Sequence, residues 1–301
     1  MAPVNLFDEK TLRKLEQLTL VTHRVRAGIM RGERRSTKHG ASVEFADYRD
    51  YTRGDDLRRL DWNVYARLER PFIKLLEEEE DLTVHLLVDA SQSMDWPPSS
   101  AGEERHKFRY ALRLAGALGY IGLSTGDRVA VTLLSGNGLV GRWGPFRSHG
   151  QTLGLLGWLG AQQPGGITDL NAALRNYALR GGRPGLALLI SDMFSPSGYH
   201  DGLTALLGRG HEVGLIHLLS PDEVEPDLAG DLRLIDSETG AGQDVSVDAA
   251  MRDLYARRLR QWRDNIAARC LARGVHYVAV ETGTPWENVI LFALRRAGVV
   301  R

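Results

Sequence analysis

The chain has 301 residues, which corresponds to one large domain or two modest ones at about 100–200 residues per domain. Hydrophobic residues (43%) and charged residues (25%) stand in the balance of a folded soluble protein, which excludes a mostly disordered, collagen-like or disulfide-rich chain. Lys and Arg together number 38 and Asp and Glu number 38, so a net charge of zero gives no general attraction to nucleic acid or to an anionic membrane.

The character of the sequence changes near residue 81. Residues 1–81 are dense in charge and rich in Arg, Asp and aromatic residues, whereas residues 82–301 alternate short apolar runs with helical patterns. We therefore predict an N-terminal charged and aromatic segment, 1–81, that packs on a main domain, 82–301. A helix is expected to begin after Asp8, whose side chain can cap its first turn.

Two runs of charge stand out in the N-terminal segment. Residues 21–40 contain six Lys and Arg against a single Glu, a local charge of +5. Residues 77–81 consist of four Glu and one Asp, a local charge of −5. The two runs can face each other or can each meet a partner, and the sequence leaves both interpretations open.

The main domain alternates strand and helix patterns. Strands are predicted over 82–88, 128–134, 139–143, 186–190, 212–219, 232–235, 245–247 and 275–280. Helices are predicted over 106–124, 151–160, 169–180, 200–208, 248–273 and 286–297. Strands separated by helices imply crossover connections, and hence an α/β fold with a mostly parallel sheet covered by helices on both faces.

Several of these predicted elements carry a further expectation. Glycines 119 and 122 share a face of the helix 106–124 and would let it approach the sheet closely. Asn137-Gly138 predicts a hairpin between 128–134 and 139–143, and the runs 232–235 and 245–247 predict a second, smaller hairpin. The helix 248–273 is expected to be amphipathic along its length. Its apolar side is formed by Met251, Leu254, Tyr255, Leu259, Trp262, Ile266 and Cys270.

The sequence also bears on the compartment. Cys270 is the single cysteine, so no internal disulfide can form, and no CxxC or Cys/His zinc spacing occurs. The longest apolar runs, such as 186–190, are far shorter than the ~18 residues that span a bilayer. The first residues lack the charged start and apolar stretch of a signal peptide. We expect a reduced, cytoplasmic protein without a membrane span.

The most informative local pattern is Asp89-x-Ser91-x-Ser93, which directly follows the first buried strand. In an open parallel sheet, ligands bind outside the carboxyl ends of the strands. Because the three residues alternate, an extended loop could turn their oxygens toward one point. Each of them also has an ordinary explanation, since a strand-end Asp often only caps a turn.

Two more oxygen-bearing positions occupy equivalent places in the chain. Thr168 and Asp169 lie where the predicted helix 169–180 begins, and Asp192 follows the strand 186–190. Either Thr168 or Asp169 would be a good helix cap without any metal. Hard cations such as Mg²⁺ take oxygen ligands, and carboxylates with hydroxyls fit that preference. Together the three loops predict a metal site of Asp89, Ser91, Ser93, Thr168 and Asp192.

These residues resemble the metal-ion-dependent adhesion site of von Willebrand factor A domains. Residues 40–51, 54–62 and 66–67 are more specific still, with Glu44-Phe45-x-x-Tyr48-Arg49 and Gly54-Asp55-Asp56 at their centre. They resemble the signature of the bacterial family called domain of unknown function 58. The resemblance covers about residues 10–300. It implies an α/β, von Willebrand factor A-like (Rossmann-like) fold that follows the family-specific segment.

The resemblance also implies a function. Members of this family tend to be encoded beside MoxR-type AAA+ ATPases, which implies an adaptor or co-chaperone that is not an enzyme. In the adhesion site, the serines and the threonine hold Mg²⁺ (alternatively Mn²⁺ or Ca²⁺), the aspartates act mostly through water, and a client protein offers an Asp or Glu to the open position. The chain keeps all five positions, but Met193 stands where a glycine is common.

The block 44–67 has two interpretations. Its aromatic residues are most simply core or interface anchors, and its charged residues are most simply ion pairs that hold an extended segment on the main domain. Alternatively, the block is a docking surface for the ATPase, because Arg and aromatic residues are favoured at interfaces.

Other patterns in the sequence suggest a rival function or other binding sites. The rival is a Mg²⁺-dependent, phosphatase-like hydrolase with Asp89 as nucleophile, but Ser91 stands where such enzymes want a second Asp, and no general base flanks the loop. A third interpretation assigns the basic stretch 24–38 to nucleic acid; the neutral total charge argues against it. Gly136-x-Gly138-x-x-Gly141 imitates a dinucleotide fingerprint, but Pro145 and its neighbours cannot open the required helix.

Overall fold

The computed structural model describes most of the chain as two compact units. It describes residue 7 and residues 9–22, 43–52, 55, 60–78, 82–98, 102, 104–180, 182–236 and 240–301. The smaller unit is formed within Gly28–Asp81, and the larger unit combines Met1–Ala27 with Leu82–Arg301. The change of character at residue 81 therefore coincides with a division of the fold, whereas the first 27 residues group with the larger unit rather than with the predicted segment 1–81.

The smaller unit is an antiparallel hairpin with one short helix. Strand β1 (Val43–Asp50) pairs with β2 (Phe72–Glu78), and α2 (Trp62–Leu68) lies between them in sequence. Asp61 caps α2 by accepting hydrogen bonds from the backbone N–H groups of Asn63 and Val64. Two of the predicted aromatic anchors in this block, Trp62 and Tyr65, are exposed, so the core interpretation is wrong for them.

Two charged residues of this block, Arg49 and Asp55, pair with each other. The Arg49 guanidinium lies 2.9 Å from Asp55, and this hydrogen bond, with two more from Thr52, lowers the pKa of Asp55 to about 2. The pair lies within the smaller unit, where it fixes the loop that follows β1.

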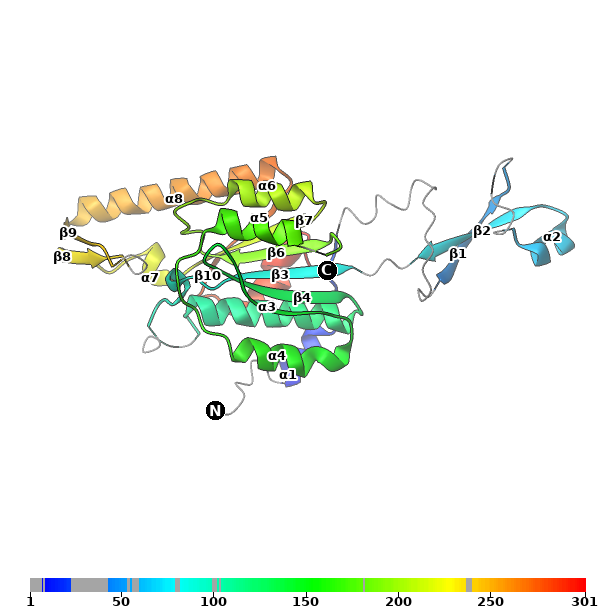
Figure 1. The fold of residues 1–301 in the computed structure, drawn as a ribbon, viewed down its shortest axis with the longest axis horizontal. Coiled ribbons are helices and arrows are strands. Elements are labelled where there is room, and N and C mark those ends of the chain that lie inside the picture. The colour runs from blue at the N-terminus through cyan, green and yellow to red at the C-terminus, as the bar shows by residue number, and fades with distance from the viewer. Residues whose placement is uncertain are drawn as a thin grey trace. The chain divides into compact units, whose positions relative to one another are not determined.

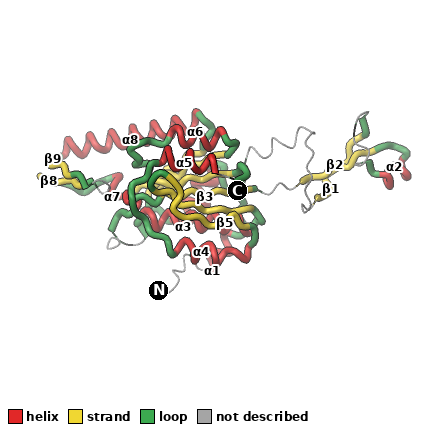
Figure 2. Tube along the Cα trace, in the orientation of Figure 1, coloured by secondary structure: helices red, strands yellow, loops and turns green. Residues whose placement is uncertain are grey.

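The larger unit is built on a six-stranded, mostly parallel sheet. Its strands, in spatial order, are β10 (His276–Glu281), β7 (Glu212–Leu219), β6 (Leu186–Ser191), β3 (Thr83–Asp89), β4 (Arg128–Ser135) and β5 (Gly138–Phe146). All neighbours are parallel except β5, which folds back on β4 as the Asn-Gly turn predicts. The predicted α/β class with a mostly parallel sheet is confirmed. Figure 2 shows the strands of this sheet between helices. The glycine pattern 136–141 lies in this hairpin, not at a strand-to-helix turn.

Helices cover both faces of this sheet (Figure 1). The side chains of α1 (Glu9–Leu15), α3 (Lys107–Ser124) and α4 (Thr152–Gly160) contribute to one buried apolar cluster. Those of α5 (Leu170–Arg180), α6 (His200–Gly208) and α8 (Ala249–Ala272) contribute to the other. The remaining helical elements are α7 (Pro221–Val224), α9 (Trp286–Asn288), a π-turn (Val289–Leu294) and short 3-10 turns at Gln92–Met94 and His149–Gln151.

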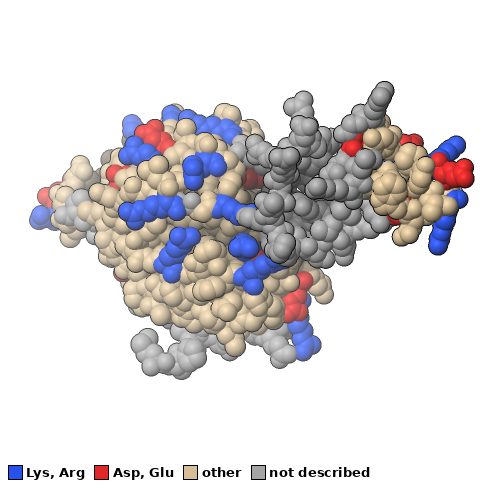
Figure 3. Space-filling model, turned by 45° about the vertical axis from the view of Figure 1, so that its right-hand side comes forward, with Lys and Arg blue, Asp and Glu red and all other residues tan. Residues whose placement is uncertain are grey.

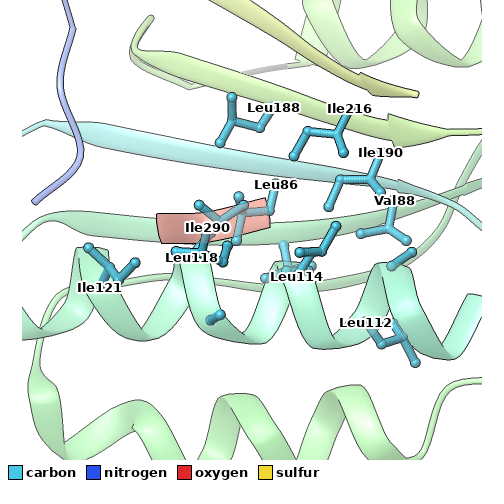
Figure 4. Close-up of a cluster of buried hydrophobic side chains, with 14 of the residues drawn as sticks. Leu86, Val88, Leu112, Leu114, Leu118, Ile121, Leu188, Ile190, Ile216 and Ile290 are labelled. Carbon is cyan, nitrogen blue, oxygen red and sulfur yellow. The ribbon is translucent and has the colours of Figure 1, made fainter. Parts of the chain in front are cut away.

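The strand β3 and the helix α3 form the centre of the core. Every residue of β3 is buried, and Leu86 and Val88 point toward Leu114 and Leu118 of α3 (Figure 4). The predicted close approach to the sheet is present, because a Cβ atom built on Gly122 would lie 2.8 Å from the side chain of Val129 in β4. Side chains larger than glycine would therefore push α3 away from its neighbours.

The N-terminal residues complete this core. Leu15, Leu18 and Leu20 are buried among the side chains of the larger unit. Leu20 forms an antiparallel bridge with Val300, and the backbones of Thr19 and Arg301 exchange hydrogen bonds. Residues 19–20 are thus tied to the last residues of the chain. Asp8, the predicted cap of α1, lies outside the described residues.

The long helix α8 is buried along only part of its length. From Leu259 onward the helix packs through Leu259, Ile266 and Cys270, whereas Met251 and Leu254 near its start are exposed. The expectation of one continuous buried stripe is therefore wrong for the first turns, which extend beyond the sheet. The predicted second hairpin, β8 (Gly230–Ile235) with β9 (Gly242–Val247), is present and solvent-exposed.

Among the described residues, no helix combines the length and apolar character that a membrane crossing needs.

Candidate functional site

The loops that carry the predicted metal ligands lie side by side at the carboxyl edge of the sheet. The backbone N–H of Gln92 donates to the carbonyl of Gly166 at 2.7 Å, and that of Gly165 donates to Ala90 at 2.8 Å. Thr168 also forms a parallel bridge with Gly136, directly after β4. These backbone bonds join the loop after β3 to the loop before α5, so that Asp89, Ser91, Ser93 and Thr168 share one region.

Asp89 is held rigidly at the end of β3. Its Oδ1 accepts the backbone N–H of Ser91 at 3.0 Å, and its Oδ2 accepts the hydroxyl of Ser191 at 2.7 Å. The side chain is buried, and burial together with the nearby negative charge of Asp192 raises the pKa of Asp89 to about 6. The carboxylate is therefore ionised at neutral pH but poorly compensated.

Three hydroxyls lie on these loops. The Oγ atoms of Ser91 and Ser93 are 2.9 Å apart, and either can donate to the other. The Thr168 hydroxyl is buried and has no hydrogen-bond partner within the described part of the chain. An unpartnered buried hydroxyl is costly, and it is the kind of group that a bound ion or water would satisfy.

Asp192 enters from the neighbouring strand β6. It is fully buried, and its Oδ1 accepts the backbone N–H of Phe194 at 3.0 Å. Ser191, the residue before Asp192, donates its hydroxyl to Asp89 and so joins the end of β6 to the end of β3. Met193, which follows Asp192, has a φ of 63°, the left-handed conformation that favours glycine. Met193 thus adopts the backbone conformation that a glycine would take.

Asp169, the residue after Thr168, has a structural role. Asp169 Oδ1 accepts the backbone N–H of Ala172 at 2.9 Å and the hydroxyl of Ser197 at 2.5 Å. The Ser197 hydroxyl and the Ala172 N–H lower the pKa of Asp169. Asp169 therefore caps α5, which is the ordinary explanation that the sequence allowed for this position.

Two charged residues of this region, Lys107 and Glu223, are not predicted from the sequence. Lys107, at the first position of α3, donates from Nζ to Asp192 Oδ2 at 2.7 Å and to Glu223 Oε1 at 2.6 Å. Burial alone would lower the pKa of Lys107, but the two carboxylates outweigh it and raise this pKa. A lysine in the first turn of a helix is usually exposed, so no sequence signal marked it.

The donor set agrees with a Mg²⁺ site in two respects. First, adjacent ligands of an octahedral Mg²⁺ ion, each at about 2.05 Å, are about 2.9 Å apart, and the Ser91 and Ser93 hydroxyls have this separation. Second, Thr168 supplies an unpartnered oxygen. The described residues include no group of three or more His, Cys, Asp or Glu side chains suited to a metal. Any metal here would thus depend on hydroxyl oxygens.

Exposed apolar side chains accompany each ligand loop. Trp96 follows Ser93, Ile167 precedes Thr168, and Phe194 follows Asp192; all three are between 38% and 47% exposed. The Phe194 ring lies 5.2 Å from Lys107 Nζ and stacks on Trp262 of α8. We call Trp96, Ile167 and Phe194 the apolar rim.

The remaining sequence signals have ordinary explanations or lie elsewhere. Cys270 is a buried thiol whose pKa burial raises to about 11. The basic stretch 24–38 lies outside the described residues. On the face of the larger unit seen in Figure 3, Lys and Arg side chains are more prominent than Asp and Glu, so local charge departs from the neutral total.

The chain is similar to several known proteins. The model of a family described as "Protein of unknown function DUF58" matches residues 47–265. The uncharacterised proteins Mb1516 of Mycobacterium bovis and Rv1480 of Mycobacterium tuberculosis are each 29% identical over 299 residues, which is 97% of this chain and 92% of theirs. Among solved structures, BatB of Bacteroides thetaiotaomicron matches with a TM-score of 0.41 and 15% identity, over 72% of this chain and 96% of that one.

Proposed function

The chain belongs to the DUF58 family, whose model matches most of its length, and on that premise we propose that it is a metal-dependent protein-binding module. In this proposal the larger unit has a von Willebrand factor A-like fold, and Mg²⁺ binds at the carboxyl edge of its sheet. Ser91, Ser93 and Thr168 contact the ion, while Asp89 and Asp192 act through water. Bound there, the ion supplies an open coordination position for a carboxylate.

The observation that carries the proposal is the hydroxyl-rich composition of the cluster. Both oxygens of Asp89 and both oxygens of Asp192 already accept hydrogen bonds from the protein. The hydroxyls are therefore the groups left to contact an ion directly, and neutral ligands leave its positive charge largely uncompensated. Such an ion attracts an acidic side chain from another molecule.

The apolar rim gives the proposed partner a second characteristic. Trp96, Ile167 and Phe194 belong to the three loops that carry the ligands, and each exposes apolar surface to solvent. An Asp or Glu flanked by apolar side chains would satisfy the ion and cover this surface together. The family resemblance provides the identity of the proposed partner, a MoxR-type AAA+ ATPase or a client protein delivered to it.

The hydrolase interpretation gains no support from the site. Asp89 is buried and accepts two hydrogen bonds, so its carboxylate is poorly placed to attack a phosphate. A panel of phosphate esters with Mg²⁺ and Mn²⁺ tests this alternative directly. Turnover by the wild type that is lost in Asp89→Asn would favour the hydrolase over the binding module.

The decisive experiment couples metal binding to partner binding. Calorimetric titration with Mg²⁺ and Mn²⁺ should reveal one site in the wild type and none in Ser91→Ala/Ser93→Ala. Capture of the purified MoxR-type ATPase from the same organism should require the cation, and the double variant should not capture it. Ser246→Ala, on the exposed hairpin β8–β9, is the matched control and should behave as the wild type. Capture that persists in excess chelator would contradict the proposal.

A further inference from the structure

Lys107 is a buried cation at the edge of the proposed metal site. Its side chain is fully buried, with Nζ held between Asp192 Oδ2 and Glu223 Oε1. Lysine is almost never buried this completely unless it is paired. The two carboxylates explain why it is tolerated here.

The position of Lys107 in α3 indicates that its role lies outside the helix. Lys107 is the first residue of α3, after the cap His106, and the positive end of a helix dipole disfavours a cation there. An acidic or neutral residue would suit the helix better. The cost is offset by contacts of the ammonium outside the helix, so the lysine serves the site rather than α3.

The charges around Lys107 do not balance. Two carboxylates, those of Asp192 and Glu223, contact one ammonium, so the contact group carries more negative than positive charge. A divalent cation would be attracted to this excess. It would also compete with the ammonium for Asp192, because both are attracted to the same carboxylate.

We infer that Lys107 is an internal counter-cation that holds Asp192 and thereby weakens binding of the divalent ion. This inference rests on the proposed function, because it concerns the affinity of the same site. When the ion binds, the Lys107–Asp192 contact weakens, and Glu223 keeps the ammonium paired. An ion that the site alone binds weakly depends more strongly on the carboxylate that a partner adds. The lysine therefore couples the binding of the ion to the binding of the partner.

Glu223 is fixed firmly enough to act as this second anchor. Its Oε2 accepts the backbone N–H of Ser220 at 2.8 Å, which closes the capping box of α7. The backbone carbonyl of Glu223 accepts a hydrogen bond from the hydroxyl of Tyr255 in α8. Glu223 therefore joins the lysine to α7 and α8, outside the ligand loops.

The test is the affinity for Mn²⁺, measured by calorimetry in wild type and in Lys107→Met. Met preserves the length of the apolar stem and removes the charge. We expect Mn²⁺ to bind about tenfold more tightly to the variant, because Met removes the repulsion between the ammonium and the ion and frees Asp192 from its competing cation. Arg109→Met, on the same helix and partly exposed, is the matched control and should change the affinity by less than about twofold.

A second pair of variants keeps the inference testable if Lys107→Met does not fold. Lys107→Met/Glu223→Gln removes both partners of one ion pair and should bind Mn²⁺ more tightly than Glu223→Gln alone. Unchanged or weaker binding on loss of the lysine, with wild-type binding intact, would overturn this inference and leave the proposed function standing. Absence of Mn²⁺ binding in the wild type and every variant would overturn both.

Discussion

The two ends of strand β3 carry buried polar side chains of opposite character. Near its amino end, His85 Nε2 donates to the carbonyl of Arg183 at 3.0 Å, and Nδ1 accepts the hydroxyl of Tyr177 at 2.7 Å. At its carboxyl end, Asp89 is charged and lies near a second carboxylate, Asp192. The two side chains lie four residues apart on one buried strand, and the first is neutral whereas the second carries a charge beside a like charge.

This contrast shows which buried polar groups indicate a site. Burial lowers the pKa of His85 to about 4, so the ring stays neutral at physiological pH and its two hydrogen bonds are complete. The Asp89 end has surplus negative charge and a hydroxyl without a partner, on Thr168. Burial and polarity occur at both ends, whereas unbalanced charge and unfilled hydrogen-bonding capacity occur together only at the second.

The largest predicted effect is the acid sensitivity that His85 confers. Its folded-state pKa of about 4 lies below the ordinary value of 6.5, so the neutral ring stabilises the fold above pH 6.5. This contribution, about 3 kcal/mol, is lost as the pH falls from 6.5 to 4. His85→Gln keeps one donor and one acceptor but does not titrate. Denaturant unfolding at several pH values measures the free energy of unfolding. Between pH 6.5 and pH 4 this free energy should fall by about 3 kcal/mol less in the variant than in the wild type.

The two ends of β3 should also differ in their response to metal. Chelator or Mg²⁺ should leave the His85 contribution unchanged, because none of its partners belongs to the proposed site. Equal acid sensitivity in wild type and His85→Gln would contradict the assignment of a neutral, buried ring to this position.

Much of this contrast could be predicted from the sequence. The strand β3 was predicted from its apolar run, and the Asp89 pattern from its place after that run. Parallel strands bring their carboxyl ends to one edge, so Thr168 and Asp192 could be assigned to the same region without coordinates. The ligand loops are local features of the sequence, and their neighbourhood follows from the fold class.

The parts that were missed depend on contacts between distant segments. Lys107 meets Glu223 only because α7 follows β7 to the same edge, and no local pattern records this. Leu20 pairs with Val300 at the opposite end of the chain, which assigns the first residues to the larger unit. The sequence of α8 is amphipathic along its whole length. Its first turns nevertheless do not pack on the sheet, so Met251 and Leu254 are exposed.

A smaller effect is predicted for the hydroxyl of Thr168. In the absence of metal, Thr168→Val should stabilise the protein by about 1 kcal/mol, because it removes a buried polar atom that has no partner. Mg²⁺ should raise the melting temperature of the wild type, since a ligand that binds the folded state stabilises it. The variant should lose this response.

Thr132→Val is the matched control for this prediction. Thr132 is fully buried in β4, and its hydroxyl also lacks a hydrogen-bond partner in the described part of the chain. The control should gain stability to a similar extent and keep the Mg²⁺ response. If Thr168→Val responds to Mg²⁺ as the wild type does, Thr168 is not a ligand.

The smallest predicted effect concerns the backbone beside Asp192. Met193 has a φ of 63°, which costs a residue with a side chain about 1 kcal/mol, and its own side chain is buried. Met193→Ala and Met193→Gly both lose the packing, but only Gly also relieves the backbone. The Gly variant should therefore be about 1 kcal/mol more stable than the Ala variant. Arg258, exposed in the middle of α8, is the control position. There the Ala variant should be more stable than the Gly variant, because Gly destabilises a helix relative to Ala. The same order at both positions would mean that the loop holding Asp192 does not require the left-handed conformation.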